Sequence, residues 1–109
     1  MALYMIQTAY TGEALSTMAK NPQDRSVPAR EVLQKLGGQL IGFYFCFGDY
    51  DVVVLAELPD DSAATACALA VAGPGHLKAY KTSKLFTVQE TMEAMRKAGS
   101  LMFQGPSRG

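Results

Sequence analysis

Two candidate functional residues, Tyr50 and Asp51, lie in the stretch FGDYDVVVL, residues 47–55. Asp51 could act as a base or a hydrogen-bond acceptor at the mouth of a pocket, with the Tyr50 hydroxyl as donor. The same residues could instead form a turn, because turns select glycine and aspartate for backbone reasons alone. In that case Tyr50 packs across from Phe47, and Asp51 accepts hydrogen bonds from turn amides. We expect the turn and keep a catalytic Asp51 as a hypothesis.

His76 is the single histidine of the sequence, and it follows a glycine-proline-glycine turn. It could act as a general base, or it could be a surface residue of the loop. One histidine would suffice as an axial ligand of haem. A zinc site needs three or four ligands, and one histidine with the separated Cys46 and Cys67 does not easily supply them. We therefore expect no metal site and take His76, with Asp51, as a catalytic candidate.

Three tyrosines are candidates for binding a ligand, because an aromatic ring with a polar tip suits the wall of a pocket for a planar molecule. They are Tyr44, Tyr50 and Tyr80. Core packing would explain Tyr44 and Tyr80 nearly as well. The sequence contains no phosphate-binding loop, dinucleotide-binding motif, nucleophile elbow or paired-cysteine metal motif.

Composition indicates one folded domain, because the chain has 109 residues and 49% of them are hydrophobic. Ten basic residues balance ten acidic residues, and they are scattered, so nucleic acid and anionic membranes are not expected partners. No apolar run is long enough to span a bilayer, and the first residues do not resemble a signal peptide. We expect a cytoplasmic protein in which both cysteines are free, buried thiols.

Apolar alternation predicts four strands, and capped amphipathic stretches predict the helices. Strands are expected at residues 2–10, 39–47, 50–58 and 76–86, and helices at 26–36, at 61–72 and from 88 onward, with an ambiguous short helix within 11–24. Asp60 and Thr87 are the expected N-caps of the last two helices, the latter with Glu90 in a capping box. The order β-α-β-β-α-β plus a terminal helix is that of an α+β, ferredoxin-like fold with a four-stranded antiparallel sheet.

The domain is expected to cover residues 1–99 and to be followed by a flexible tail, residues 100–109. Within this tail, FQGP resembles part of a protease-cleavage linker used in protein expression. Part of the tail is therefore a candidate for non-native sequence, and no function is assigned to it.

A two-residue loop of Gly48 and Asp49 would pair the second and third strands and fix which residues share a face. One face, which includes Ile41, is an evident core. The other face carries Leu40, Tyr44, Val53 and Leu55, which are too apolar as a group to remain in water. The terminal helix could cover part of this second face. A second copy of the chain could cover the rest, which would give a two-fold dimer with the sheets face to face.

Two segments of this sequence resemble the GYD-domain family. Residues 48–51 match its G-x-Y-D motif at a hairpin, and residues 57–60 match the acidic-apolar-Pro-Asp segment that ends the following strand. The resemblance extends over about residues 2–99 and implies a ferredoxin-like domain of the dimeric α+β-barrel type. Members of that broad superfamily include cofactor-free monooxygenases, lactone isomerases, haem-handling proteins and ligand-sensing regulators, so the resemblance implies no single activity.

Three hypotheses follow, and whether the protein is an enzyme is left open. The first is a homodimeric or larger assembly without a cofactor, which binds a small, partly apolar or aromatic molecule between sheet and helices. The second is a cofactor-independent monooxygenase or isomerase, in which His76 or Asp51 moves a proton and a tyrosine stabilises the oxyanion. It requires His76 and Asp51 to point into one pocket. The third is a structural or interaction module with an interface and no pocket.

Overall fold

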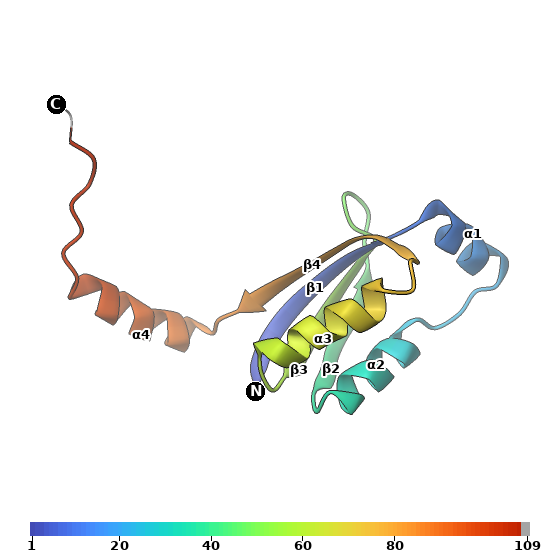
Figure 1. Cartoon of the computed structure of the whole chain (residues 1–109), viewed down its shortest axis with the longest axis horizontal. Helices are drawn as coiled ribbons and strands as arrows, with labels where there is room; N and C mark the ends of the chain where they lie inside the picture. The colour runs from blue at the N-terminus through green and yellow to red at the C-terminus, as the bar shows by residue number, and fades with distance from the viewer. Residues whose placement is uncertain (108–109) are drawn as a thin grey trace.

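A four-stranded antiparallel sheet with helices on one face forms the body of the protein in a computed structural model that describes residues 1–107 (Figure 1). The elements are β1 (Ala2–Tyr10), α1 (Gly12–Lys20), α2 (Ser26–Lys35), β2 (Gln39–Phe45), β3 (Val52–Leu58), α3 (Asp61–Ala72), β4 (Leu77–Leu85) and α4 (Val88–Gly99). The strand order in the sheet is β2-β3-β1-β4. The α+β, ferredoxin-like fold predicted from the sequence is confirmed. The ambiguous stretch forms α1, which Thr11 caps.

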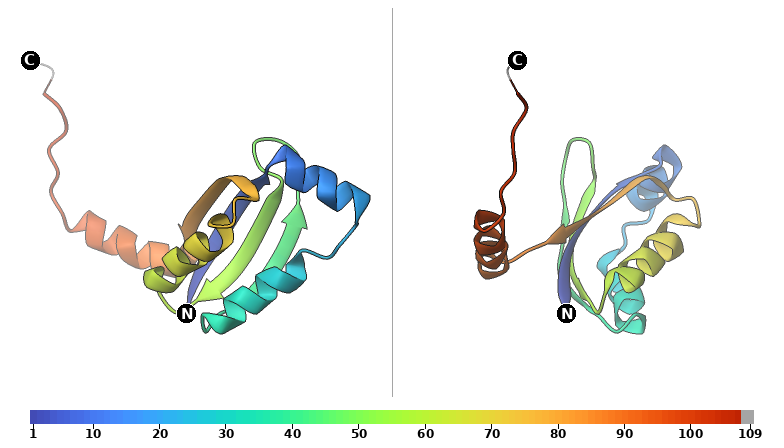
Figure 2. Two further views of the ribbon diagram at one scale, coloured as in Figure 1. Left: turned by 45° about the vertical axis from the view of Figure 1, so that its right-hand side comes forward. Right: turned by 60° about the vertical axis from the view of Figure 1, so that its left-hand side comes forward.

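The core lies between the sheet and the helices α2 and α3, which cover the same face (Figure 2). Alternate residues of the two central strands point toward these helices: Tyr4 and Ile6 from β1, and Val52, Val54, Ala56 and Leu58 from β3. Helix α3 is rich in alanine and buries Ala64 and Cys67, because small side chains let its backbone approach the sheet closely. Asp60 caps α3 as predicted, with its side chain accepting a hydrogen bond from the Ala63 amide at 2.8 Å.

One end of β2 departs from the predicted alternation. Leu40 pairs with Ala56 and Gly42 pairs with Leu55, so Ile41 is an extra, bulged residue. A bulge reverses which residues face the core on one side of it. Leu40 therefore packs against the core, whereas Ile41 is 49% exposed. The prediction that Ile41 faces the core and Leu40 the opposite face is wrong for this reason.

The β2–β3 connection is longer than the predicted two-residue turn. The strands end at Phe45 and begin again at Val52, and Phe47 is fully exposed. The Cys46 amide still donates to the Asp51 carbonyl at 2.8 Å, so these two residues face each other as predicted. Gly48 lies in this connection with φ 128°, a conformation that favours glycine.

Helix α4 begins with the predicted capping box of Thr87 and Glu90 and then projects away from the body, on the side of the sheet opposite α1–α3 (Figure 2). Its apolar residues are open to solvent: Val88 is 77% and Met95 63% exposed. The radius of gyration is 18.0 Å, against about 13 Å for a compact domain of 100 residues. An isolated helix of this length is marginal in water. Within one chain, then, the terminal helix leaves the second sheet face uncovered.

A buried tyrosine joins β1 to the start of α3 and makes stability sensitive to alkaline pH. The Tyr4 hydroxyl donates to Asp61 at 2.5 Å, and Lys84 Nζ lies 3.2 Å from the same carboxylate. Burial and the neighbouring carboxylate raise the pKa of Tyr4 to about 12 from 10.0. The folded state thus holds this proton more tightly than the unfolded state, so the stabilisation is complete below pH 10 and is lost as pH rises toward 12.

We expect Tyr4→Phe to flatten this pH dependence. Urea unfolding measured over a pH series should show wild-type protein losing more stability between pH 10 and 12 than the variant does. The two proteins differ only in the Tyr4 hydroxyl, so the comparison reports on that group. Parallel losses in the two proteins would show that the Tyr4 hydroxyl does not carry the effect.

Candidate ligand-binding site

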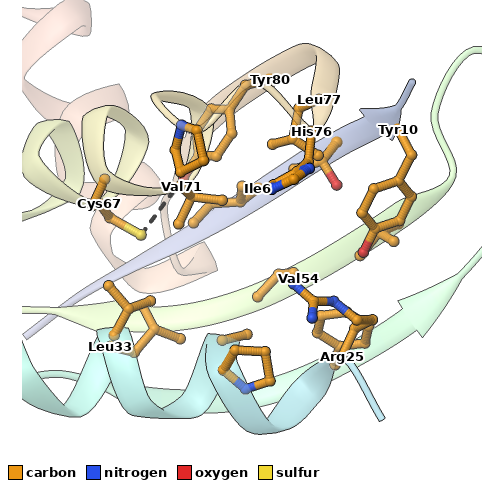
Figure 3. Close-up of a pocket in the computed structure, with 18 residues that line it drawn as sticks. Ile6, Tyr10, Arg25, Leu33, Val54, Cys67, Val71, His76, Leu77 and Tyr80 are labelled. Atoms are coloured by element: carbon orange, nitrogen blue, oxygen red, sulfur yellow. Dashed lines mark hydrogen bonds between the residues drawn. The ribbon is translucent and has the colours of Figure 1, made fainter. Parts of the chain in front are cut away.

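A cavity of about 300 Å³ lies between the helix-facing side of the sheet and the helices α2 and α3 (Figure 3). This volume is at the lower end of the range of small-molecule sites, about 300–1,000 Å³. Most of its wall is apolar, with contributions from Ile6, Leu33, Val54, Val71 and Leu77. The wall is apolar because the core faces of β1 and β3 meet the apolar sides of the two helices there.

Two buried residues bring hydroxyl groups to the apolar wall. Thr8 is 7% and Tyr10 8% exposed, and both line the cavity. Neither side-chain hydroxyl has a hydrogen-bond partner among residues 1–107. Every side-chain nitrogen or oxygen that is fully enclosed within these residues does have a partner. Both hydroxyls are therefore reached by solvent. Since each residue lines the cavity, these groups are available to a molecule inside it.

The cavity opens toward α1 through a polar entrance. A second cavity of about 370 Å³ lies there and shares Tyr10, Arg25, Pro74 and His76 with the first. We call these four residues the entrance. Figure 3 shows the side chains of Arg25 and His76 on opposite walls, near Tyr10, while Leu33 and Cys67 lie toward the other end.

Of the predicted site residues, the structure brings His76 and Tyr80 to this cavity. His76 lies just before β4, and its carbonyl accepts a hydrogen bond from the Thr11 amide at 3.0 Å. The Tyr80 hydroxyl donates to the Cys67 sulfur at 3.6 Å. Burial raises the pKa of the Tyr80 hydroxyl and that of the Cys67 thiol. Both groups are therefore neutral near pH 7, so the cysteine is not an activated nucleophile.

Asp51 lies outside the cavity lining and bonds to the backbone of β1. Its carboxylate accepts from the Tyr10 amide at 2.8 Å, and its own amide donates to the Thr8 carbonyl at 2.8 Å. These bonds continue the pairing of β3 with β1 beyond the strand end. Asp51 thus holds in place the segment that carries the two cavity hydroxyls.

Tyr44 and Tyr50 are also outside the cavity lining. Tyr50 is half-buried in the β2–β3 connection, where its carbonyl accepts from the Cys46 thiol at 3.1 Å. Tyr44 is exposed on the sheet face that the helices leave free. Its ring lies over Gly42, where a side chain would come within 2.8 Å of the ring.

Sequence reasoning missed Thr8, Tyr10 and Arg25. The first two share a strand face with Ile6, so alternation alone could have placed them beside the predicted core. Arg25 stands at the N-cap position of α2 and reaches the cavity only through tertiary packing. No local pattern marks it.

Among residues 1–107, no three histidine, cysteine, aspartate or glutamate side chains are grouped so that they could hold a metal ion. No helix within the same residues has the length and apolar character needed to cross a membrane.

The fold and the cavity together describe a ferredoxin-like α+β domain with a small, mostly apolar pocket. The model of the GYD domain family matches residues 4–95. The chain therefore belongs to the GYD domain family, and the resemblance seen in the sequence is confirmed.

Comparisons with individual proteins support the fold of the chain and indicate no activity. No curated protein matches the chain. The crystal structure of MtbAldR is similar, with a TM-score of 0.56 at 15% sequence identity, over 79% of this chain and 52% of that one. The match thus spans about half the length of MtbAldR. At this identity the similarity shows the fold alone.

Proposed function

We propose that this protein is a small-molecule-binding domain that acts as a homodimer or larger assembly, with a partly apolar ligand in the cavity between the sheet, α2 and α3. The observation that carries the proposal is that two buried residues, Thr8 and Tyr10, present hydroxyls without a partner in the described chain to a mostly apolar cavity. A cavity produced by imperfect packing alone would be lined by apolar groups.

Binding is favoured over catalysis by the position of the two catalytic candidates. Proton transfer of the kind considered above needs His76 and Asp51 in one pocket, but only His76 lines the cavity. The Asp51 carboxylate is engaged by the Tyr10 amide. Tyr80 already donates to Cys67, so it is not free to stabilise an oxyanion.

The free face of the sheet supports the assembly part of the proposal. This face, which we call the open face, carries Leu3, Met5, Tyr44, Val53, Leu55 and Leu85. Helices α1–α3 lie on the other face, and α4 projects on this side without folding back (Figure 2). A second copy of the chain would cover both the open face and the apolar stripe of α4, as two-fold symmetry allows.

Binding to the cavity is tested with hydrocinnamamide, a neutral probe with one aromatic ring and one polar end, by following amide chemical shifts in an NMR titration. We expect shifts at cavity residues such as Thr8 and Tyr80. Ala70→Phe should weaken binding by about tenfold or more, a change of about 1.4 kcal/mol, because Ala70 lines the cavity.

The matched control is Ala66→Phe, which changes another exposed alanine of α3 that does not line the cavity. It should bind as wild type does. Equal binding by both variants, or shifts confined to the open face, would contradict a site in this cavity.

A further inference from the structure

We infer that the ligand is a small apolar acid whose carboxylate lies at the entrance between Arg25 and His76. Its apolar part would lie in the first cavity, between the sheet, α2 and α3, which we call the inner cavity. The inference rests on the proposed function, because it names the class of molecule that the same cavity would bind. It is drawn from the charge at the entrance, from the donors around it and from the size of the cavity.

The guanidinium of Arg25 is a cation without an acidic partner. Its Nη1 donates to the Gln23 side chain at 3.1 Å. Within residues 1–107, no carboxylate lies within ion-pair distance of it. Arg25 is only partly exposed. A guanidinium presents five N–H donors in a planar fork that matches a carboxylate, so most of its donors remain available to a ligand.

The neighbouring groups are also donors. The imidazole of His76 offers an N–H in either protonation state. The Tyr10 hydroxyl has no partner in the described chain and lies at the same entrance. A carboxylate has about four lone-pair sites. It could therefore accept hydrogen bonds from Arg25, His76 and Tyr10 together.

The second cavity, which we call the outer cavity, carries a negative charge. Glu13 from α1 lines it, beside Thr17 and Gln23. A carboxylate placed farther out would approach Glu13 and be repelled, whereas one at the entrance lies next to Arg25. This arrangement favours a single acidic group at the entrance and disfavours a second one farther out.

The inner cavity limits the rest of the ligand. At about 300 Å³ with an apolar wall, it suits one ring or a short aliphatic group rather than a long chain. Apolar surface that the ligand buries there contributes favourably to the free energy of binding. The acid group would then supply orientation and selectivity.

The test compares hydrocinnamate with hydrocinnamamide, which differ only in the charged end, by calorimetric or NMR titration at neutral pH. Wild type should bind the acid about tenfold or more tightly than the amide, as expected for hydrogen bonds to a charged group. Arg25→Gln should remove most of this preference, because it should weaken binding of the acid far more than binding of the amide. Glu13→Gln should strengthen binding of the acid more than binding of the amide.

Arg30→Gln serves as the charge control, because Arg30 is an exposed arginine of the same helix outside the cavity lining. It should keep the wild-type preference. Thermal unfolding of each variant verifies that it is folded, and Arg25→Lys, which keeps the charge, should retain part of the preference.

If the amide binds and the acid binds no better, or if Arg25→Gln keeps the preference, the inference is wrong and the proposed cavity stands. If neither probe binds at millimolar concentration, both fail.

Discussion

Replacing Leu55 by aspartate should convert the proposed dimer into monomers. Leu55 lies in the middle of β3 on the open face, where it is paired with Met5 and Gly42 on the adjacent strands. In a two-fold, face-to-face assembly, each chain would bury this position against its partner. Burying an unpaired carboxylate costs several kcal/mol, and symmetry would introduce two of them. We therefore expect the dissociation constant to rise by about 100-fold or more.

The measurement is sedimentation or light scattering over a wide concentration range. Leu69→Asp is the matched control, because Leu69 is an exposed leucine of α3 on the other side of the sheet. It should dimerise as wild type does. A wild-type protein that stays monomeric throughout, or a Leu55→Asp variant that dimerises normally, would contradict assembly through the open face.

Gly38→Ala should be strongly destabilising, although it adds one methyl group. The Gly37 amide donates to the Gln34 carbonyl at 3.0 Å and the Gly38 amide to the Leu33 carbonyl at 2.9 Å. This pattern ends α2 in a Schellman motif. A Cβ on Gly38 would lie 2.1 Å from the Glu57 carbonyl oxygen. That oxygen belongs to β3, so relief of the contact requires β2 and β3 to separate.

We expect Gly38→Ala to lower the free energy of unfolding by about 3 kcal/mol, a large share of the usual 5–15 kcal/mol of a domain. Urea unfolding gives the value, and an unchanged denaturant slope would show that the loss is in the folded state. Gly12→Ala is the control, because nothing lies within 4 Å of the position its Cβ would take. It should be neutral or slightly stabilising. Similar stability of both variants would contradict the close approach at Gly38.

Local signals were enough to predict the fold. Asp60 and the Thr87–Glu90 capping box mark helix starts through bonds between near neighbours in the chain, so the sequence contains them directly. The bulge at Ile41 could not be predicted in the same way. Leu40 and Ile41 are both apolar, so the pattern does not show which one faces the core.

The candidate site was predictable only in part. His76 and Tyr80 were singled out for their chemistry, and the structure places both at the cavity. Arg25 reaches the same cavity from the start of α2, a relation that depends on how α2 packs on the sheet. The hydrogen bonds of Asp51 to β1 show why a residue with catalytic potential can serve mainly to hold a strand end in place.

Native mass spectrometry of the protein taken directly from its host tests most directly whether this is an oligomeric small-molecule-binding domain. It reports the number of subunits and any retained small molecule together. We expect a dimer or larger assembly that carries an additional mass, and an acid of a few hundred daltons or less would fit a cavity at the low end of ligand-site volumes. A bare monomer would contradict both the coverage of the open face by a second chain and an occupied cavity.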